Sequence, residues 1–243
     1  PTCFTFGVTE NNESKVAKNV ANIVNAPHHF IKLSSDPYSE KIDEMVYLGG
    51  GMYVFDHSIF YGYSKEVQNY ANVLFHGHGI DYMFQGMYVP SKPFKIWNKN
   101  SPYLKIRSLS QDIVHDFLHN IPFRLKFDLI SYIKKEYRSK LYDALYNSIE
   151  QVFSQGKDFC NTPYDLWEYG IIHSLSRHYP NTNLSSIASC AEQRTIVFEN
   201  NIFDFYLSLP NEHRINSKIA RKTLEIMNPD LSKLKLANNN FSA

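Results

Sequence analysis

The first part of the chain alternates short apolar runs with one amphipathic stretch. Residues 2–7 are β-branched and aromatic and end at a glycine, which predicts a buried strand. Apolar residues recur at helical spacing over 13–24, with lysines and asparagines on the other face and Asn11 or Asn12 as the cap. Residues 29–33 predict a second strand. Strand, helix and strand in this order predict a β-α-β unit in a parallel sheet.

A glycine loop follows the third predicted strand. Residues 39–47 and 56–70 read as helices, and 73–75 as a strand that runs into His76-Gly77-His78-Gly79-Ile80-Asp81. A further helix is expected to start near Tyr82. Open α/β sheets bind ligands at such loops, between the carboxyl end of a strand and a helix.

The pattern changes after Pro90. Long amphipathic stretches over 110–179 and shorter ones over 183–234 predict helices, and no low-complexity linker separates them from the sheet part. We therefore predict an α/β part at 1–90 and a mainly helical part of the same domain at 91–243.

Charge and cysteine content exclude several classes of protein. Lys and Arg number 25 against 24 acidic residues, which gives no bias toward nucleic acid or anionic membrane. No apolar run approaches the roughly 20 residues of a membrane span, and no secretory signal opens the chain. Cys3, Cys160 and Cys190 stand singly, without the spacing of a zinc site or a disulfide framework. These features predict a cytoplasmic protein.

Three segments, in order, resemble the synthetase domain of the asparagine synthetase family. Residues 3–7, the helix ending in Val20-Ala21-Asn22 and the pair His28-His29 are similar to the family's second strand, helix and following strand entrance. Residues 73–88 resemble the family stretch VLSGxGxDExFGGY and agree with it at Gly77, Gly79, Asp81, Phe84 and Gly86. Residues 186–210 carry Glu192 and Arg194 of the family's E-x-R and end in its S-L-P.

The resemblance implies a fold and a reaction. The fold is α/β, with a parallel sheet of the adenine-nucleotide alpha-hydrolase (HUP) type followed by a mainly helical lobe. In the family, ATP adenylates a small-molecule carboxylate to an acyl-AMP, and ammonia then displaces AMP to give an amide. ATP and Mg²⁺ are the implied cofactors.

By position, the resemblance also assigns a nucleotide site. Phe6 would lie beside the adenine through its backbone, with Gly7 in the same site. Gly77 and Gly79 would permit close approach to the nucleotide. Asp81 would be the metal ligand and a catalytic residue, because hard carboxylate oxygens suit Mg²⁺.

Two further assignments come from the carboxyl-terminal part. Glu192 is a candidate catalytic residue, although Glu192 and Arg194 could equally serve separate capping or salt-bridge roles. The family carries a phosphate-contacting lysine where this chain has 214–222, and Lys218 is assigned to it with Lys222 left open.

The chain also departs from the family pattern. It has no S-G-G-x-D-S phosphate loop and no glutaminase half, and the loop is expected to lie before Pro1. The sheet is then truncated at its amino end, with an open edge that could pair with a second copy. His78 and Tyr82 replace two acidic residues of the family. The alternative is a degenerate, non-catalytic member that acts as a binding or scaffold module, with a closed sheet edge.

Simpler explanations stay open for the loop itself. A strand-to-helix turn needs glycine for backbone reasons alone. His76, His78 and Asp81 could form a metal site, although alternation on a loop is weak support for one.

Overall fold

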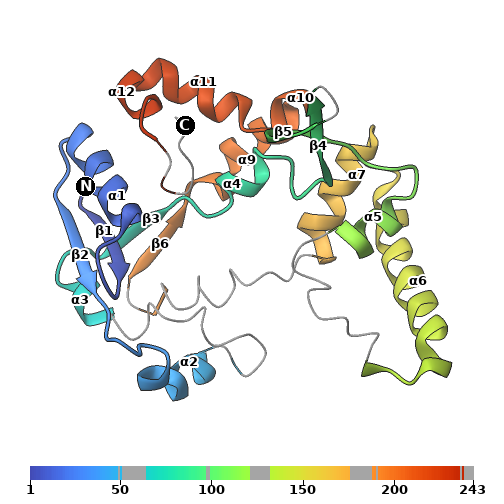
Figure 1. The fold of residues 1–243 in the computed structure, drawn as a ribbon, viewed down its shortest axis with the longest axis horizontal. Helices are drawn as coiled ribbons and strands as arrows, with labels where there is room; N and C mark the ends of the chain where they lie inside the picture. The colour runs from blue at the N-terminus through green and yellow to red at the C-terminus, as the bar shows by residue number, and fades with distance from the viewer. Residues whose placement is uncertain are drawn as a thin grey trace. The chain divides into compact units, whose positions relative to one another are not determined.

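The computed structural model describes residues 1–48, 50, 64–96, 99–120, 132–175, 188–189, 191–235 and 237. The chain forms two compact units, which we call unit 1 and unit 2 (Figure 1). Unit 1 comprises Pro1–Asp81, His178–Ser208 and Ser217–Ala243, and unit 2 comprises Tyr82–Arg177 and Leu209–Asn216. The division at residue 90 stays a prediction.

Unit 1 opens with the β-α-β unit that the sequence predicts. Strand β1 (Cys3–Gly7) leads through helix α1 (Asn12–Ile23) to strand β2 (His28–Lys32). The two strands pair in parallel, from Cys3 opposite His28 to Gly7 opposite Lys32. Asn11 is the cap: its side chain accepts from the Ser14 N–H at 3.0 Å, and Ser14 Oγ accepts from the Asn11 N–H at 2.9 Å.

Short helices connect β2 to the third strand. A 3-10 turn (Ser39–Lys41) continues into α2 (Ile42–Leu48), as predicted. Helix α3 (Ser64–Gln68) confirms part of the helix predicted over 56–70, and residues 56–63 lie outside the described residues.

The glycine loop follows the first strand of a second parallel pair. Strand β3 (Val73–His76) pairs in parallel with β6 (Glu192–Thr195), and helix α4 (Ile80–Met83) begins directly after the loop. The helix starts two residues before the predicted position. The sequence did not predict β6.

The two strand pairs contact one small core. Ile31 of β2 and Val67 of α3 are buried at its centre. Partly buried side chains of β1, β3 and the residue before β6 pack against them, namely Phe4, Phe6, Leu74 and Ala191. Among the described residues the pairs do not join, so the observed architecture is mixed α/β with separate parallel pairs.

Helices complete unit 1 at its carboxyl-terminal end. A 3-10 turn (Ile196–Phe198) leads from β6 into α9 (Asn200–Ser208). Helices α11 (Lys218–Met227) and α12 (Pro229–Ser232) follow and confirm the short helices that the sequence predicts here. No described helix has both the length and the apolar character that a bilayer span needs.

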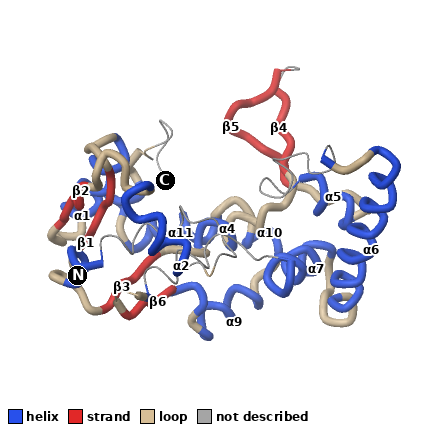
Figure 2. Tube along the Cα trace, turned by 90° about the horizontal axis from the view of Figure 1, so that it is seen from below, coloured by secondary structure: helices blue, strands red, loops and turns tan. Residues whose placement is uncertain are grey.

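Unit 2 begins with a hairpin that the sequence did not predict. Strands β4 (Ser91–Ile96) and β5 (Lys99–Arg107) pair antiparallel. They are the red segments labelled β4 and β5 in Figure 2. Pro93 and Pro102 lie within these strands and lower their β-propensity, which conceals the hairpin in the sequence.

The described residues after the hairpin in unit 2 are mainly helical, as predicted, and residues 121–131 and 176–179 of the predicted helical stretch lie outside the described residues. Helices α5 (Ile113–Asn120), α6 (Arg138–Gly156) and α7 (Pro163–Gly170) are followed by a π-helical turn (Ile171–Leu175). Their core is aromatic. The Phe117 ring meets the rings of Phe153 and Trp167 edge-on, at centroid distances of 5.7 and 6.0 Å, and Trp167 Nε1 donates to Met87 O at 2.6 Å.

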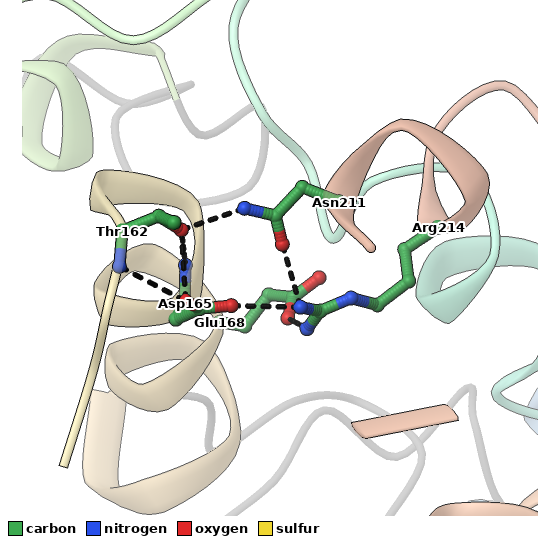
Figure 3. Close-up of polar contacts among 5 residues, drawn as sticks. All are labelled: Thr162, Asp165, Glu168, Asn211 and Arg214. Atoms are coloured by element: carbon green, nitrogen blue, oxygen red, sulfur yellow. Dashed lines mark hydrogen bonds and ion pairs between the residues drawn. The ribbon is translucent and has the colours of Figure 1, made fainter. Parts of the chain in front are cut away.

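A buried ion cluster ties helix α10 (Asn211–Arg214) to α7 within unit 2 (Figure 3). Arg214 is 5% exposed and forms ion pairs with Glu168, which is also buried, and with Asp165 at 2.7 Å. Asn211 Oδ1 accepts from the same guanidinium at 2.6 Å, and its amide donates to Thr162 Oγ1 at 2.6 Å. Because Asp165 also completes the Thr162 capping box, one cluster fixes both helices.

Candidate nucleotide site

All of the residues that the sequence assigns to the site belong to unit 1. They come from β1, the loop between β3 and α4, strand β6 and the start of α11: Phe6, Gly7, Gly77, Gly79, Asp81, Glu192 and Lys218. The fold therefore brings the three sequence segments into one compact unit, although their roles stay predictions.

A groove of about 720 Å³ lies between β1 and β3. Its walls are residues 1–6 on one side, β3 on the other, and Val67, Tyr70 and Ala71 from α3 and the turn after it. Phe6 and His76, near the carboxyl ends of the two strands, both line it. None of the described residues that line it is Lys, Arg, Asp or Glu, so this part of the groove suits an uncharged group.

The two loop glycines differ in their surroundings. A Cβ on Gly79 would lie 2.6 Å from Val197 Cγ2, and its φ of +96° also disfavours any side chain. Gly79 is therefore required by the fold of unit 1. Gly77 is exposed, and a Cβ there would have only Ile80 Cδ1 nearby, at 3.9 Å. Packing does not explain Gly77, so it is the glycine with room for a ligand.

Gly7, at the end of β1, also has a packing role. A Cβ at this position would lie 3.1 Å from Phe30 Cζ and 3.3 Å from the carbonyl oxygen of Thr9. The Phe30 ring of β2 therefore covers Gly7. The side chain of the neighbouring Phe6 packs against the core around Ile31 and Val67.

His76 links the loop to β6. Its Nε2 lies 3.0 Å from Thr195 Oγ1 and 3.3 Å from Gln193 Oε1, and its Nδ1 accepts from the His78 N–H at 3.4 Å. These contacts suit the tautomer in which Nε2 donates and Nδ1 accepts. Among the described side chains no group of three or more His, Cys, Asp or Glu could hold a metal. Because the Asp81 side chain is not among them, the metal site of His76, His78 and Asp81 stays a prediction.

Asp81 is the second residue of α4, directly after the loop. Its side chain lies outside the described residues, and its assignment to Mg²⁺ stays a prediction.

Glu192 and Arg194 lie on strand β6. Residues two apart on a strand share one face, and these two side chains form an ion pair with 55% and 62% exposure. Separate roles for Glu192 and Arg194 would follow on a helix, where residues two apart do not face each other, and that alternative is wrong for this strand.

Lys218 is the first residue of α11 and is exposed. Lys222, one turn later, donates to Glu225 Oε2 at 3.1 Å. Within the described part of the chain Lys218 forms no ion pair, which leaves it the more available cation.

Comparison with protein families gives the observation that decides the family. The model of the asparagine synthase family matches residues 1–231, which include all of unit 2 and all of unit 1 except residues 232–243. The chain belongs to the asparagine synthase family. A search of curated proteins found no match.

Membership in the asparagine synthase family bears on the candidate site, because the segments that form the site are part of the match. The glycine loop after β3, strand β6 and helix α11 all lie within the matched residues. The sequence prediction of the family is therefore confirmed.

Proposed function

We propose that this asparagine synthase domain is an ATP-dependent carboxylate-amide ligase. In the proposed reaction a carboxylate oxygen attacks the α-phosphorus of ATP, releases pyrophosphate and forms an acyl-AMP. Ammonia then attacks the acyl carbon, and AMP leaves with the carboxylate oxygen. The substrate class is a small carboxylic acid.

One observation carries this proposal: the open groove between β1 and β3. A degenerate scaffold module is expected to close its sheet edge, whereas a nucleotide-binding sheet needs a cleft at the carboxyl ends of its strands. Phe6, which is predicted to lie beside the adenine, and His76, directly before the glycine loop, line the same groove. The groove therefore favours the ligase over the scaffold.

We further propose that the two strand pairs belong to one HUP-type sheet. Both pairs are parallel, and both contact the core around Ile31 and Val67.

The residues of this chain suit the base and ribose of ATP better than its pyrophosphate. The uncharged groove suits the base and ribose, with Phe6 beside the adenine. The exposed Gly77 allows the phosphates to approach the loop backbone, and Lys218 supplies a cation. The sequence S-G-G-x-D-S does not occur in residues 1–243, so we place the groups that grip pyrophosphate outside them.

Mg²⁺ would be held by Asp81 and would neutralise the leaving pyrophosphate. His78 stands where the family has an acidic residue, so the loop carries less negative charge than the family pattern. The metal site then depends strongly on Asp81. Glu192, the candidate catalytic carboxylate, pairs with Arg194 and lies opposite Val73, at the end of β3 away from the glycine loop.

The test is carboxylate-dependent exchange of labelled pyrophosphate into ATP, measured on the natural full-length protein. Aspartate and a panel of other small acids serve as substrates. We expect exchange with at least one acid, its loss in Asp81→Ala, and its retention in Asp43→Ala, an exposed carboxylate of α2. Absence of exchange with every acid, together with no ATP binding, would favour the scaffold alternative.

A further inference from the structure

Helix α5 of unit 2 carries two histidines one turn apart, away from the candidate nucleotide site. The ring centroids of His115 and His119 are 4.2 Å apart, and the ring planes are tilted by 43°. Both side chains are exposed, so burial in a core does not explain the pair. We propose that the two imidazoles bind one divalent transition-metal ion, Zn²⁺ or an ion of similar preference, and that water completes its coordination shell.

The spacing of the two histidines is one that suits a shared metal ion. Residues four apart on a helix lie on the same face, and two histidines at this spacing bind zinc on helices with the pattern H-E-x-x-H. Imidazole nitrogen is a good ligand for Zn²⁺, whereas Mg²⁺ prefers oxygen. Asp116, at the position of the general base in that pattern, is buried and accepts from the Ser110 N–H. The pair therefore predicts metal binding without peptide hydrolysis.

The helix that carries the pair is held in place by its neighbours. Phe117, on another face of α5, is buried among the aromatic rings of unit 2. Asp112 Oδ1 accepts from the His115 N–H at 2.8 Å, and Asp112 Oδ2 accepts from the Tyr146 hydroxyl of α6 at 3.0 Å. A backbone that is already fixed lowers the entropic cost of bringing two rings to one ion.

Tyr142 of α6 contacts the second histidine. Its hydroxyl oxygen lies 3.2 Å from His119 Nε2, and the two rings stack at a centroid distance of 5.9 Å. A histidine that binds a metal through one ring nitrogen commonly donates a hydrogen bond from the other, which fixes the ring. If Nε2 donates to Tyr142, the lone pair of His119 Nδ1 is left for the metal. Tyr142 is then a positioning residue of the site.

The pair supplies fewer ligands than a structural zinc site has. Structural zinc takes four protein ligands and catalytic zinc three. Where side chains are described, no cluster of three or more His, Cys, Asp or Glu is close enough to hold a metal, so two imidazoles are the protein's share. The remaining positions are open to water or to a group on another molecule. We therefore expect an exchangeable ion on which the fold of unit 2 does not depend.

The experiment is calorimetric titration of Zn²⁺ into the full chain, with side-chain ¹H–¹⁵N spectra of the histidines recorded during the titration. The variants are His115→Gln, His119→Gln and Tyr142→Phe. The matched control is His213→Gln, at an exposed histidine of α10. Zinc bound by cysteine thiols contributes equally to every variant, so the differences between variants report the pair. Urea unfolding without zinc checks that each variant is folded.

Chelation gives a specific result. Because two linked ligands bind far better than either alone, each histidine variant should lower the Zn²⁺ affinity by about tenfold or more. The signals of His115 and His119 should shift together at the same zinc concentration. Tyr142→Phe should lower the affinity less, and His213→Gln should leave it unchanged.

Two results would overturn the proposal. The first is equal zinc binding by the unmodified chain and both histidine variants. The second is a loss of bound zinc at unchanged affinity in each variant, with the two signals shifting independently, which indicates two separate imidazoles. No nucleotide takes part, so failure here is distinct from failure of the ligase proposal.

Discussion

Gly79 and Val197 lie so close together that the glycine has no room for a side chain. A Cβ on Gly79 would come within 2.6 Å of Val197 Cγ2, and φ at Gly79 is +96°. The contact joins the loop after β3 to the 3-10 turn after β6. The position of the loop therefore depends on a residue more than a hundred positions away in the sequence.

Gly79→Ala should lower the free energy of unfolding by about 1–3 kcal/mol, because it combines a clash with a left-handed backbone. Adding Val197→Ala should restore the part due to the clash. Gly77→Ala, at an exposed position with open space, should change stability by less than about 0.5 kcal/mol. Urea unfolding measures all three. Equal effects of the two glycine variants would contradict the close contact.

Removal of Arg214 should be far more costly than removal of Arg194. Arg214→Ala leaves the buried Glu168 carboxylate without its cation, and about 3–5 kcal/mol of stability should be lost. Arg194→Ala breaks an ion pair that is more than half exposed and should cost less than about 1 kcal/mol. Thermal and urea unfolding of the two variants test this difference. Similar losses would show that the cluster of Figure 3 is not buried in solution.

Cys160 should react slowly with alkylating reagents at neutral pH. Burial raises the pKa of its thiol, and the charges of Asp165 and Glu168 add to this effect. The pH profile of Cys160 alkylation should therefore lie at higher pH in the folded chain than in urea. Because the folded pKa is raised, the contribution of this thiol to stability is present below its unfolded pKa and falls as pH rises through the folded value. Coincident profiles would contradict the assignment.

Local patterns in the sequence predict much of unit 1. A short apolar run predicts β1, apolar residues at a 3.6-residue period predict α1, and a second apolar run predicts β2. Each of these signals lies within the segment whose structure it predicts. The glycine loop and the start of α4 are also visible, because glycine and the following amphipathic turn are local signals.

Elements that depend on contacts with distant segments of the chain cannot be predicted from such local patterns. Strand β6 reads Glu-Gln-Arg-Thr, a polar segment that becomes a strand because it pairs with β3, and β4–β5 contains prolines. The ion pair of Glu192 and Arg194 depends on that strand, since a helix would separate them. The role of Gly79 depends on Val197. The groove depends on the placement of β1 beside β3, which single-segment patterns do not specify.

We propose that unit 1 binds ATP with Mg²⁺ at the loop containing Gly77 and Asp81. Calorimetric titration of ATP and Mg²⁺ into residues 1–243 and into the natural full-length protein tests it most directly. Asp81→Asn removes the proposed metal ligand with little change in volume, and Asp43→Asn is its control. We predict binding by the full-length protein that is lost in Asp81→Asn and kept in Asp43→Asn. No binding by the full-length protein, or equal binding by both variants, would contradict the account.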